Sequence, residues 1–233
     1  VYSIKRPFWQ QTFSRLGNWI PAHFVEFVFL LWLLIYWGTS LTSNLNIGVR
    51  HLLPTFPFVY ILVSAGIISF SNSIKNFGFK FIGYSLLIIL ILWQAISIIA
   101  ICSHFLAYFN EIVGGPDKGY IYTVNSNLDW GQDLKRLKKW VDENNIDKIY
   151  VEYFGGGDAK YYLKEKFRPW QGNRDPKELP KGSYLAVSAT FLQGGRGEPV
   201  MGFDQSYGHY RWLYQYEPPI KKIGYSIFVY QIK

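Results

Sequence analysis

Three long apolar runs in the first half of the chain restrict its possible folds more than any other feature. They cover residues 24–41, 52–70 and 81–101, and their one charged residue is Glu26, near the edge of the first run. A helix needs about 20 mostly apolar residues to cross a bilayer, and each run has roughly that length. A helix on a globular surface keeps a polar stripe, which these runs lack. The sequence therefore predicts three transmembrane helices.

The composition of the chain changes near Cys102. Residues 1–102 hold only six of the 24 Lys and Arg residues and one of the 16 acidic residues, so the charge is concentrated in the rest of the chain. Such a division is typical of two structural parts with different surroundings. We expect a membrane region over residues 24–102, preceded by a segment of residues 1–23, and a small α/β domain over residues 103–233.

The loop charges predict an orientation in the membrane. Basic residues gather before the first run and in the short loop before the third, at Lys5, Arg6, Arg15, Lys75 and Lys80. Three spans place these two segments on the same side, which the positive-inside rule makes cytoplasmic. The chain is then an integral protein of the cell membrane. Its residues 1–23 are cytoplasmic, and the domain of residues 103–233 is extracytoplasmic.

An arginine and a histidine stand side by side between the first two runs. Arg50 and His51 precede Leu52 and Pro54, so they lie at the mouth of the membrane on the side opposite Lys75. A guanidinium group offers a planar fork of donors that suits phosphate. We predict that Arg50 and His51 bind a lipid phosphate. The alternative is that Arg50 extends to ordinary headgroups or pairs with an acidic residue elsewhere.

The domain after residue 102 is expected to alternate helices and strands. Helical spacing of Leu134, Leu137 and Val141 predicts an amphipathic helix that begins near Trp130. The remaining pattern predicts a helical continuation of the third span over 104–111, strands over 147–154, 184–191 and 223–232, helices over 159–167 and 207–216, and loops over 155–158, 168–182 and 193–198.

The residues around the start of the amphipathic helix have two readings that do not exclude each other. Asp129 as an N-cap and Gln132 three positions later form a capping-box pattern. Alternatively, the amides and carboxylate of Asn127, Asp129 and Gln132 bond sugar hydroxyls, while the indole of Trp130 stacks on a sugar ring. The four residues are therefore possible substrate-binding residues.

Several kinds of chemistry find no support in the sequence. It contains no HExxH, CxxC, GxSxG or P-loop pattern, and the glycines of 155–157 lack the spacing of a dinucleotide site. We therefore assign no metal ligands and no cofactor, and leave open whether the intact protein uses a divalent metal. The net charge of +8 is spread over loops and helix faces, which gives no support for a nucleic-acid partner.

Five stretches resemble a known enzyme family. They are NIGVRHLLPTFPF (46–58), AYFNEIVGGPDKGY (107–120), SNLDWGQDLKRLKKW (126–140), VEYFGGGDAKYYL (151–163) and IGYSIFVYQI (223–232). Together they resemble the membrane glycosyltransferases of family 39, the protein O-mannosyltransferase-like group of the GT-C fold class. Asn125 departs from the pattern, because related sequences tend to have an acidic residue there.

The resemblance implies an activity and a place for this chain within it. Such enzymes move a sugar from a polyprenyl-phosphate-linked donor to a glycan or protein acceptor at the outer face of the membrane. The three helices would be the carboxy-terminal part of a GT-C bundle. The catalytic carboxylate of the family lies in an early outer loop that has no counterpart here, so we assign no catalytic residue and expect the chain alone to be inactive.

A different class of function stays open beside this one. The chain could belong to a non-catalytic membrane protein whose outer domain binds a glycan or a partner protein. A transporter is less favoured, because Glu26 is the one ionisable residue within the apolar runs.

Overall fold

The computed structural model of the chain describes residues 17, 19–43, 48–197 and 209–233. The chain forms two compact units, residues 1–90 and residues 91–233, and each is described separately. Lys5, Arg6 and Arg15, on which part of the orientation prediction depends, lie outside the described residues, as do most of the segment 1–23 and the start of the predicted helix 207–216.

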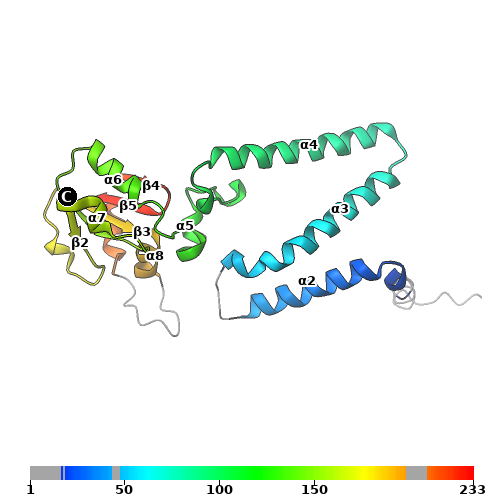
Figure 1. Cartoon of the computed structure of the whole chain (residues 1–233), viewed down its shortest axis with the longest axis horizontal. Helices are drawn as coiled ribbons and strands as arrows, with labels where there is room; N and C mark the ends of the chain where they lie inside the picture. Colours follow the sequence, from blue (N-terminus) through cyan, green and yellow to red (C-terminus); the bar gives the residue numbers. More distant parts are fainter. Residues whose placement is uncertain (1–16, 18, 44–47, 198–208) are drawn as a thin grey trace, which may run out of the picture. The chain divides into compact units, whose positions relative to one another are not determined.

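The first unit is built from long apolar helices (Figure 1). They are α2 (Phe24–Thr42), the 3₁₀ helix η1 (Gly48–Thr55), α3 (Phe56–Ser73) and α4 (Phe77–Ala100), whose last turns belong to the second unit. Three stretches, Phe24–Thr42, Gly48–Ser73 and Phe77–Ala100, are long and apolar enough to cross a membrane. The three predicted runs are therefore confirmed as helices that differ from the prediction by a few residues at their ends.

The outer surfaces of these helices are apolar. Neither α2 nor α3 has a buried residue, and side chains such as Leu34 and Phe70 are largely exposed. The hydroxyl groups of Thr39 and Thr42 donate to carbonyl oxygens of their own helix, so they do not need water. Helices that are apolar on every face are stable in hydrocarbon or inside a larger bundle, which indicates a membrane protein.

The second unit contains one mixed sheet with the strand order β2-β1-β3-β5-β4. The strand β1 pairs in parallel with β2 and β3, and β5 pairs antiparallel with β3 and β4. The strands are β1 (Ile149–Glu152), β2 (Phe167–Pro169), β3 (Tyr184–Ser188), β4 (Lys221–Ile223) and β5 (Ile227–Gln231).

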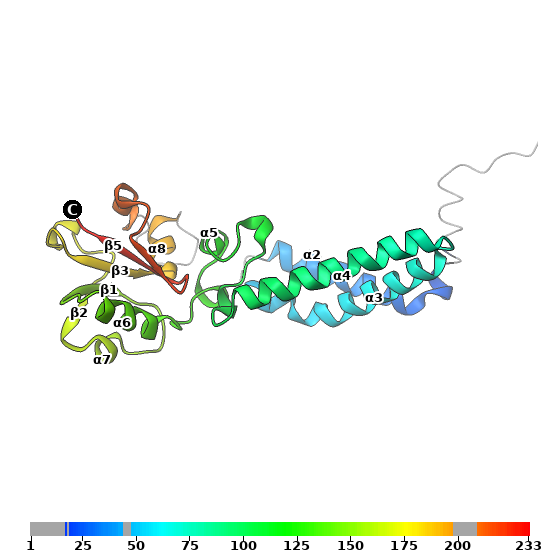
Figure 2. The same cartoon turned by 90° about the horizontal axis from the view of Figure 1, so that it is seen from above.

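Helices cover both faces of this sheet (Figure 2). The helices α6 (Leu134–Glu143) and α7 (Ala159–Leu163) cover one face, while α8 (Ala189–Arg196) and η7 (Arg211–Tyr216) cover the other. The shorter helices are α5 (Gly119–Tyr122), η2 (Phe105–Ala107), η3 (Glu111–Val113), η4 (Asn125–Asn127), η5 (Lys164–Lys166) and η6 (Pro176–Glu178). The predicted small α/β domain is confirmed.

Alternation along the strands divides the core into two clusters. On β3, Leu185 and Val187 pack in the cluster with Leu192 of α8, whereas Ala186 packs in the cluster with Leu137 of α6. Successive strand residues point to opposite faces, so each strand supplies both layers.

Some predicted boundaries were wrong, and most errors occur where the backbone turns left-handed. The helix of the third span ends at Ala100 and does not continue over 104–111, because Ser103 has a φ of 71°. The predicted helix 159–167 stops at Leu163, since Lys164 has a φ of 51°. The predicted strand 223–232 is broken by Gly224, whose φ of 57° ends β4 and lets the chain return as β5.

Other errors have different causes. The predicted strand 184–191 ends at Ser188 and the predicted loop 193–198 is helical as far as Arg196, because α8 begins at Ala189 and buries one side against the sheet. The predicted loop 168–182 contains most of β2, a three-residue edge strand that ends at Pro169. A proline is tolerated there because an edge strand needs fewer paired amides.

Leu137 is fully buried between α6 and the sheet, so its truncation should destabilise the second unit. We expect Leu137→Ala to lower the free energy of unfolding by about 2–5 kcal/mol, through lost contacts and the cavity left behind. Lys139→Ala on the exposed side of the same helix is the control and should change it by less than about 1 kcal/mol, since its pair with Glu143 is exposed. Urea unfolding in detergent micelles, followed by tryptophan fluorescence, measures both, and equal losses would contradict this packing.

Candidate functional site

The predicted phosphate-binding pair lies on the 3₁₀ helix η1. Arg50 and His51 occupy consecutive positions on it, and both side chains are exposed. Gly48 opens the turn with a φ of 76°, and Pro54 lies inside it. Since consecutive residues of a 3₁₀ helix lie 120° apart, the two cations cover neighbouring sides of one turn.

Two aromatic residues of α2 hold this turn in place. The Tyr36 hydroxyl donates to the carbonyl oxygen of His51 over 2.6 Å, and the Trp37 indole nitrogen donates to the Thr55 hydroxyl over 3.2 Å. That hydroxyl is buried and donates in turn to the carbonyl oxygen of Leu52 over 2.6 Å. The backbone beneath Arg50 and His51 is therefore tied to α2 by groups that belong to neither side chain.

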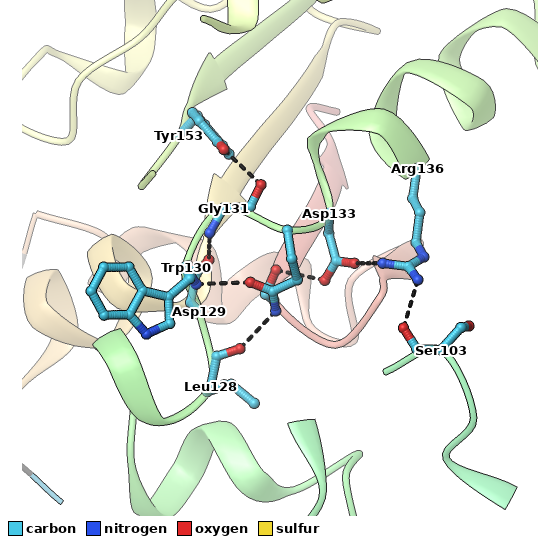
Figure 3. Close-up of polar contacts among 10 residues, drawn as sticks. Ser103, Leu128, Asp129, Trp130, Gly131, Asp133, Arg136 and Tyr153 are labelled. Carbon is cyan, nitrogen blue, oxygen red and sulfur yellow. Dashed lines mark hydrogen bonds and ion pairs between the residues drawn. The ribbon is translucent and has the colours of Figure 1, made fainter. Parts of the chain in front are cut away.

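The second predicted site is the loop of residues 126–133, here called the SNLDWGQD loop (Figure 3). The loop turns at Gly131, whose φ of 75° is left-handed. A helix cannot pass through this conformation, so α6 begins at Leu134 and not near Trp130. The predicted N-cap role of Asp129 at the start of α6 is therefore wrong.

The side chains of Asp129 and Gln132 brace the loop itself. The Asp129 carboxylate accepts from the Gly131 amide over 3.0 Å, which forms an Asx turn. The Gln132 side-chain oxygen accepts from the Trp130 amide, and its nitrogen donates to the Leu128 carbonyl, both over 2.8 Å. The bonds resemble those of a capping box, but they close a turn and not a helix.

The four predicted substrate-binding residues differ in their access to solvent. Asp129 is fully buried, Asn127 is half-buried on η4, and Gln132 is exposed but bonded at both ends of its amide. Trp130 is 57% exposed, and its indole nitrogen donates to the Ser126 carbonyl over 3.0 Å, which sets the direction of the ring. The sugar surface stays a prediction, and Trp130 is its most accessible member.

A second buried carboxylate at the end of the loop was not predicted. Asp133 accepts from the Ser226 hydroxyl over 2.7 Å and pairs with the Arg136 guanidinium over 2.6 Å. Arg136 also donates to the carbonyl oxygen of Ser103 over 2.7 Å, so this cluster connects α6 to the chain that leaves α4. In the sequence, Asp133 stands three positions before Arg136 at the start of a helix. This spacing of an acidic and a basic residue is too common to indicate a site.

Burial controls the electrostatics of both carboxylates. It raises the pKa of Asp129 to about 6, with a further rise from Asp133, while bonds from Gly131 and Thr190 oppose the shift. Burial also raises the pKa of Asp133, against the bonds from Ser226 and Arg136. Asp129 therefore changes its charge near pH 6, although the side chain itself does not reach the surface.

The SNLDWGQD loop is pressed against the end of β1. The Tyr153 hydroxyl donates to the Gly131 carbonyl oxygen over 2.7 Å. A Cβ atom on Gly131 would collide with Tyr153 and with the backbone of Gly155. This position therefore demands glycine both for its φ and for the space around it.

Within the residues that the structure describes, no group of three or more His, Cys, Asp and Glu side chains could hold a metal ion.

Comparisons with known protein families, with curated proteins and with solved structures find no match to this chain.

Replacing Gly131 should loosen the loop. We expect Gly131→Ala to lower the free energy of unfolding by about 2 kcal/mol or more, from the strained φ and the collision with Tyr153. Gly156→Ala is the matched control: nothing lies within 4 Å of a Cβ there, so the expected change is within about 0.5 kcal/mol. Urea unfolding compares the two, and an equal response would contradict the described fit.

The raised pKa of Asp129 predicts a pH dependence of stability. The pKa of Asp129 is about 6 in the folded protein and 3.8 ordinarily, so the folded state binds the proton more tightly than the unfolded state. The resulting stabilisation is fully present below pH 3.8 and is lost as the pH rises through 6. Two pKa units correspond to about 3 kcal/mol. Asp129→Asn, which stays neutral, should lose less stability than the wild type between pH 4 and pH 7, whereas the exposed control Asp147→Asn should follow the wild type. Thermal unfolding across this range would contradict the shift if all three proteins gave the same slope.

Proposed function

We propose that this chain is the carboxy-terminal part of an integral membrane glycosyltransferase that takes a sugar from a polyprenyl-phosphate carrier. The observation that carries the proposal is the η1 turn, which presents Arg50 and His51 at the end of an apolar helix. A lipid-linked phosphate has the matching chemistry, since its tail dissolves in hydrocarbon while its anionic head stays at the interface.

The chemistry of glycosyl transfer gives this cationic turn a role. When the sugar leaves its carrier, negative charge develops on the carrier phosphate. A guanidinium held at that phosphate stabilises the charge and lowers the barrier. The bonds from Tyr36 and Trp37 fix the turn before the carrier arrives, so less order must be created on binding.

The loop charges support an orientation for this site. Lys75 lies between α3 and α4, and Lys80 lies in the first turns of α4, at the end of α3 opposite η1. Basic loops favour the cytoplasmic side, which would put η1 and the domain after α4 outside the cytoplasm. The acceptor, a glycan or a protein, would be modified on that outer side, and no catalytic residue is assigned to this chain.

Carrier binding tests the proposal directly. We expect Arg50→Gln to weaken the binding of a short-chain polyprenyl phosphate by about 10-fold or more, because charge-assisted bonds to phosphate are lost. Arg50→Lys keeps the charge but loses the planar fork, and should fall between the wild type and Arg50→Gln. The chain is placed in phosphatidylcholine nanodiscs, and binding is followed by native mass spectrometry.

Two controls separate this role from general attraction to lipid. The first is phosphatidic acid, which offers a phosphate on an ordinary lipid, and the second is the Lys75→Gln variant, which removes a cation from another loop. Binding of the polyprenyl phosphate that is no tighter than binding of phosphatidic acid, or that survives Arg50→Gln unchanged, would reject the proposal. In the complete protein, Arg50→Gln should also reduce turnover.

A further inference from the structure

A cavity of about 540 Å³ opens in the second unit where the parallel strands end. This volume is within the range of roughly 300–1,000 Å³ that is typical of small-molecule sites. Residues within or after the three parallel strands line it, among them Glu152, Tyr153, Phe167, Trp170, Gln171 and Phe191. None of these residues was predicted to form a site.

The topology of the sheet places the cavity where ligands of open α/β sheets bind. The chain leaving β1 passes through α7 to β2 on one side, while the chain leaving β3 passes through α8 and returns as β5 on the other. Neighbouring strands whose connections diverge leave a crevice between their carboxyl ends. Tyr153 follows β1 and Phe191 lies beyond the end of β3, and both residues line the cavity.

A carboxylate in the wall is held in a fixed position. The hydroxyl of the buried Tyr210 and the amide of Gly172 both donate to Oε2 of Glu152, the amide over 3.1 Å. Within the described part of the chain, both hydrogen bonds of this side chain fall on Oε2, so Oε1 can accept from a ligand. Burial also raises the pKa of Glu152.

The other walls are aromatic or amide in character. Phe191 packs edge-on against Phe154 with ring centroids 5.8 Å apart, and the Arg174 guanidinium lies 4.9 Å from the Trp170 ring. Arg174 is already occupied, because it pairs with Glu178 and donates to the Pro169 carbonyl oxygen. The exposed Gln171 adds an amide that can both donate and accept.

The charges around the cavity disfavour the phosphate-bearing ligands that bind many such crevices. The first turn of α7, where a phosphate would lie, is capped by the carboxylate of Asp158, which accepts from the Lys160 amide over 2.8 Å. A phosphate there would meet two carboxylates, those of Asp158 and Glu152, which repel an anion. A neutral ligand with several hydroxyl groups fits better, because hydroxyls donate to a carboxylate while aliphatic ring faces pack on aromatic side chains.

We propose that this cavity is a carbohydrate-binding site, in which Oε1 of Glu152 accepts from sugar hydroxyls and Phe191 and Tyr153 contact the faces of the ring. The inference does not depend on the glycosyltransferase activity, since it uses no residue of η1. Within a glycosyltransferase, such a site would hold part of a glycan acceptor.

Saturation-transfer NMR on the whole chain tests the site with four probes, the methyl α-glycosides of mannose, glucose, galactose and N-acetylglucosamine. Phosphatidylcholine nanodiscs replace sugar-based detergents, which would compete. At least one probe should show saturation transfer with an affinity of millimolar order. Glu152→Gln should reduce its affinity about 10-fold, because a bond to a charged group is lost while the bonds from Tyr210 and Gly172 can persist.

Three further variants complete the design. Phe191→Ala should also weaken binding. Gln171→Ala should do the same, and because Gln171 is exposed this change leaves the core intact. Glu143→Gln removes an exposed carboxylate from α6 and should bind like the wild type. Arg50→Gln should also bind the sugar normally, which separates this site from the carrier site.

Two results would overturn the proposal. One is the absence of saturation transfer from all four probes while the wild-type domain is folded. The other is transfer that Glu152→Gln, Phe191→Ala and Gln171→Ala all leave unchanged, since the sugar would then lie elsewhere.

Discussion

The close approach of Gly131 to Gly155 beneath the Tyr153 hydroxyl is the contact on which the arrangement of the second unit depends. It holds the SNLDWGQD loop against the end of β1 and leaves no room for a side chain. The loop places the carboxylates of Asp129 and Asp133 in the interior of the unit. There the Asp129 carboxylate accepts from a backbone amide, and the Asp133 carboxylate accepts from a hydroxyl and a guanidinium group. The same tyrosine lines the cavity, so one side chain joins the loop to the carboxyl ends of the strands.

The two units are stabilised by different physical effects. The sheet buries two clusters of apolar side chains of its own, which is the usual source of stability for a small domain. The long helices expose their apolar surface almost entirely, and the hydroxyls of Thr39 and Thr42 are bonded to the backbone of their own helix. They therefore depend on a surrounding apolar medium, whether that medium is lipid or further helices.

The sequence predicted those features that depend on many residues at once. Long apolar runs and the alternating segment of β1 give strong periodic signals, and the structure contains all of them. The prediction from sequence failed where one backbone angle decides where a helix begins or ends, as at Ser103, Gly131 and Lys164. The sequence does not distinguish a serine or lysine with a positive φ angle from one with an ordinary φ angle, because tertiary contacts impose these angles.

The candidate sites show the same division. Arg50 and His51 could be found from sequence because a cation between two apolar runs is conspicuous. The cavity around Glu152 could not, because its walls come from three strand ends that are far apart in the chain and meet only through the parallel pairing of β1 with β2 and β3. Tyr210, which fixes the carboxylate, is 58 positions away from Glu152.

The attachment of η1 to α2 has a consequence for how such a protein can diverge. Tyr36 binds the backbone oxygen of His51, and Trp37 binds the side chain of Thr55, so these two bonds do not use the side chains of Arg50 and His51. Both bonds can therefore persist when residues 50 and 51 are exchanged during evolution. Related chains could keep the turn and change the head group that it recognises.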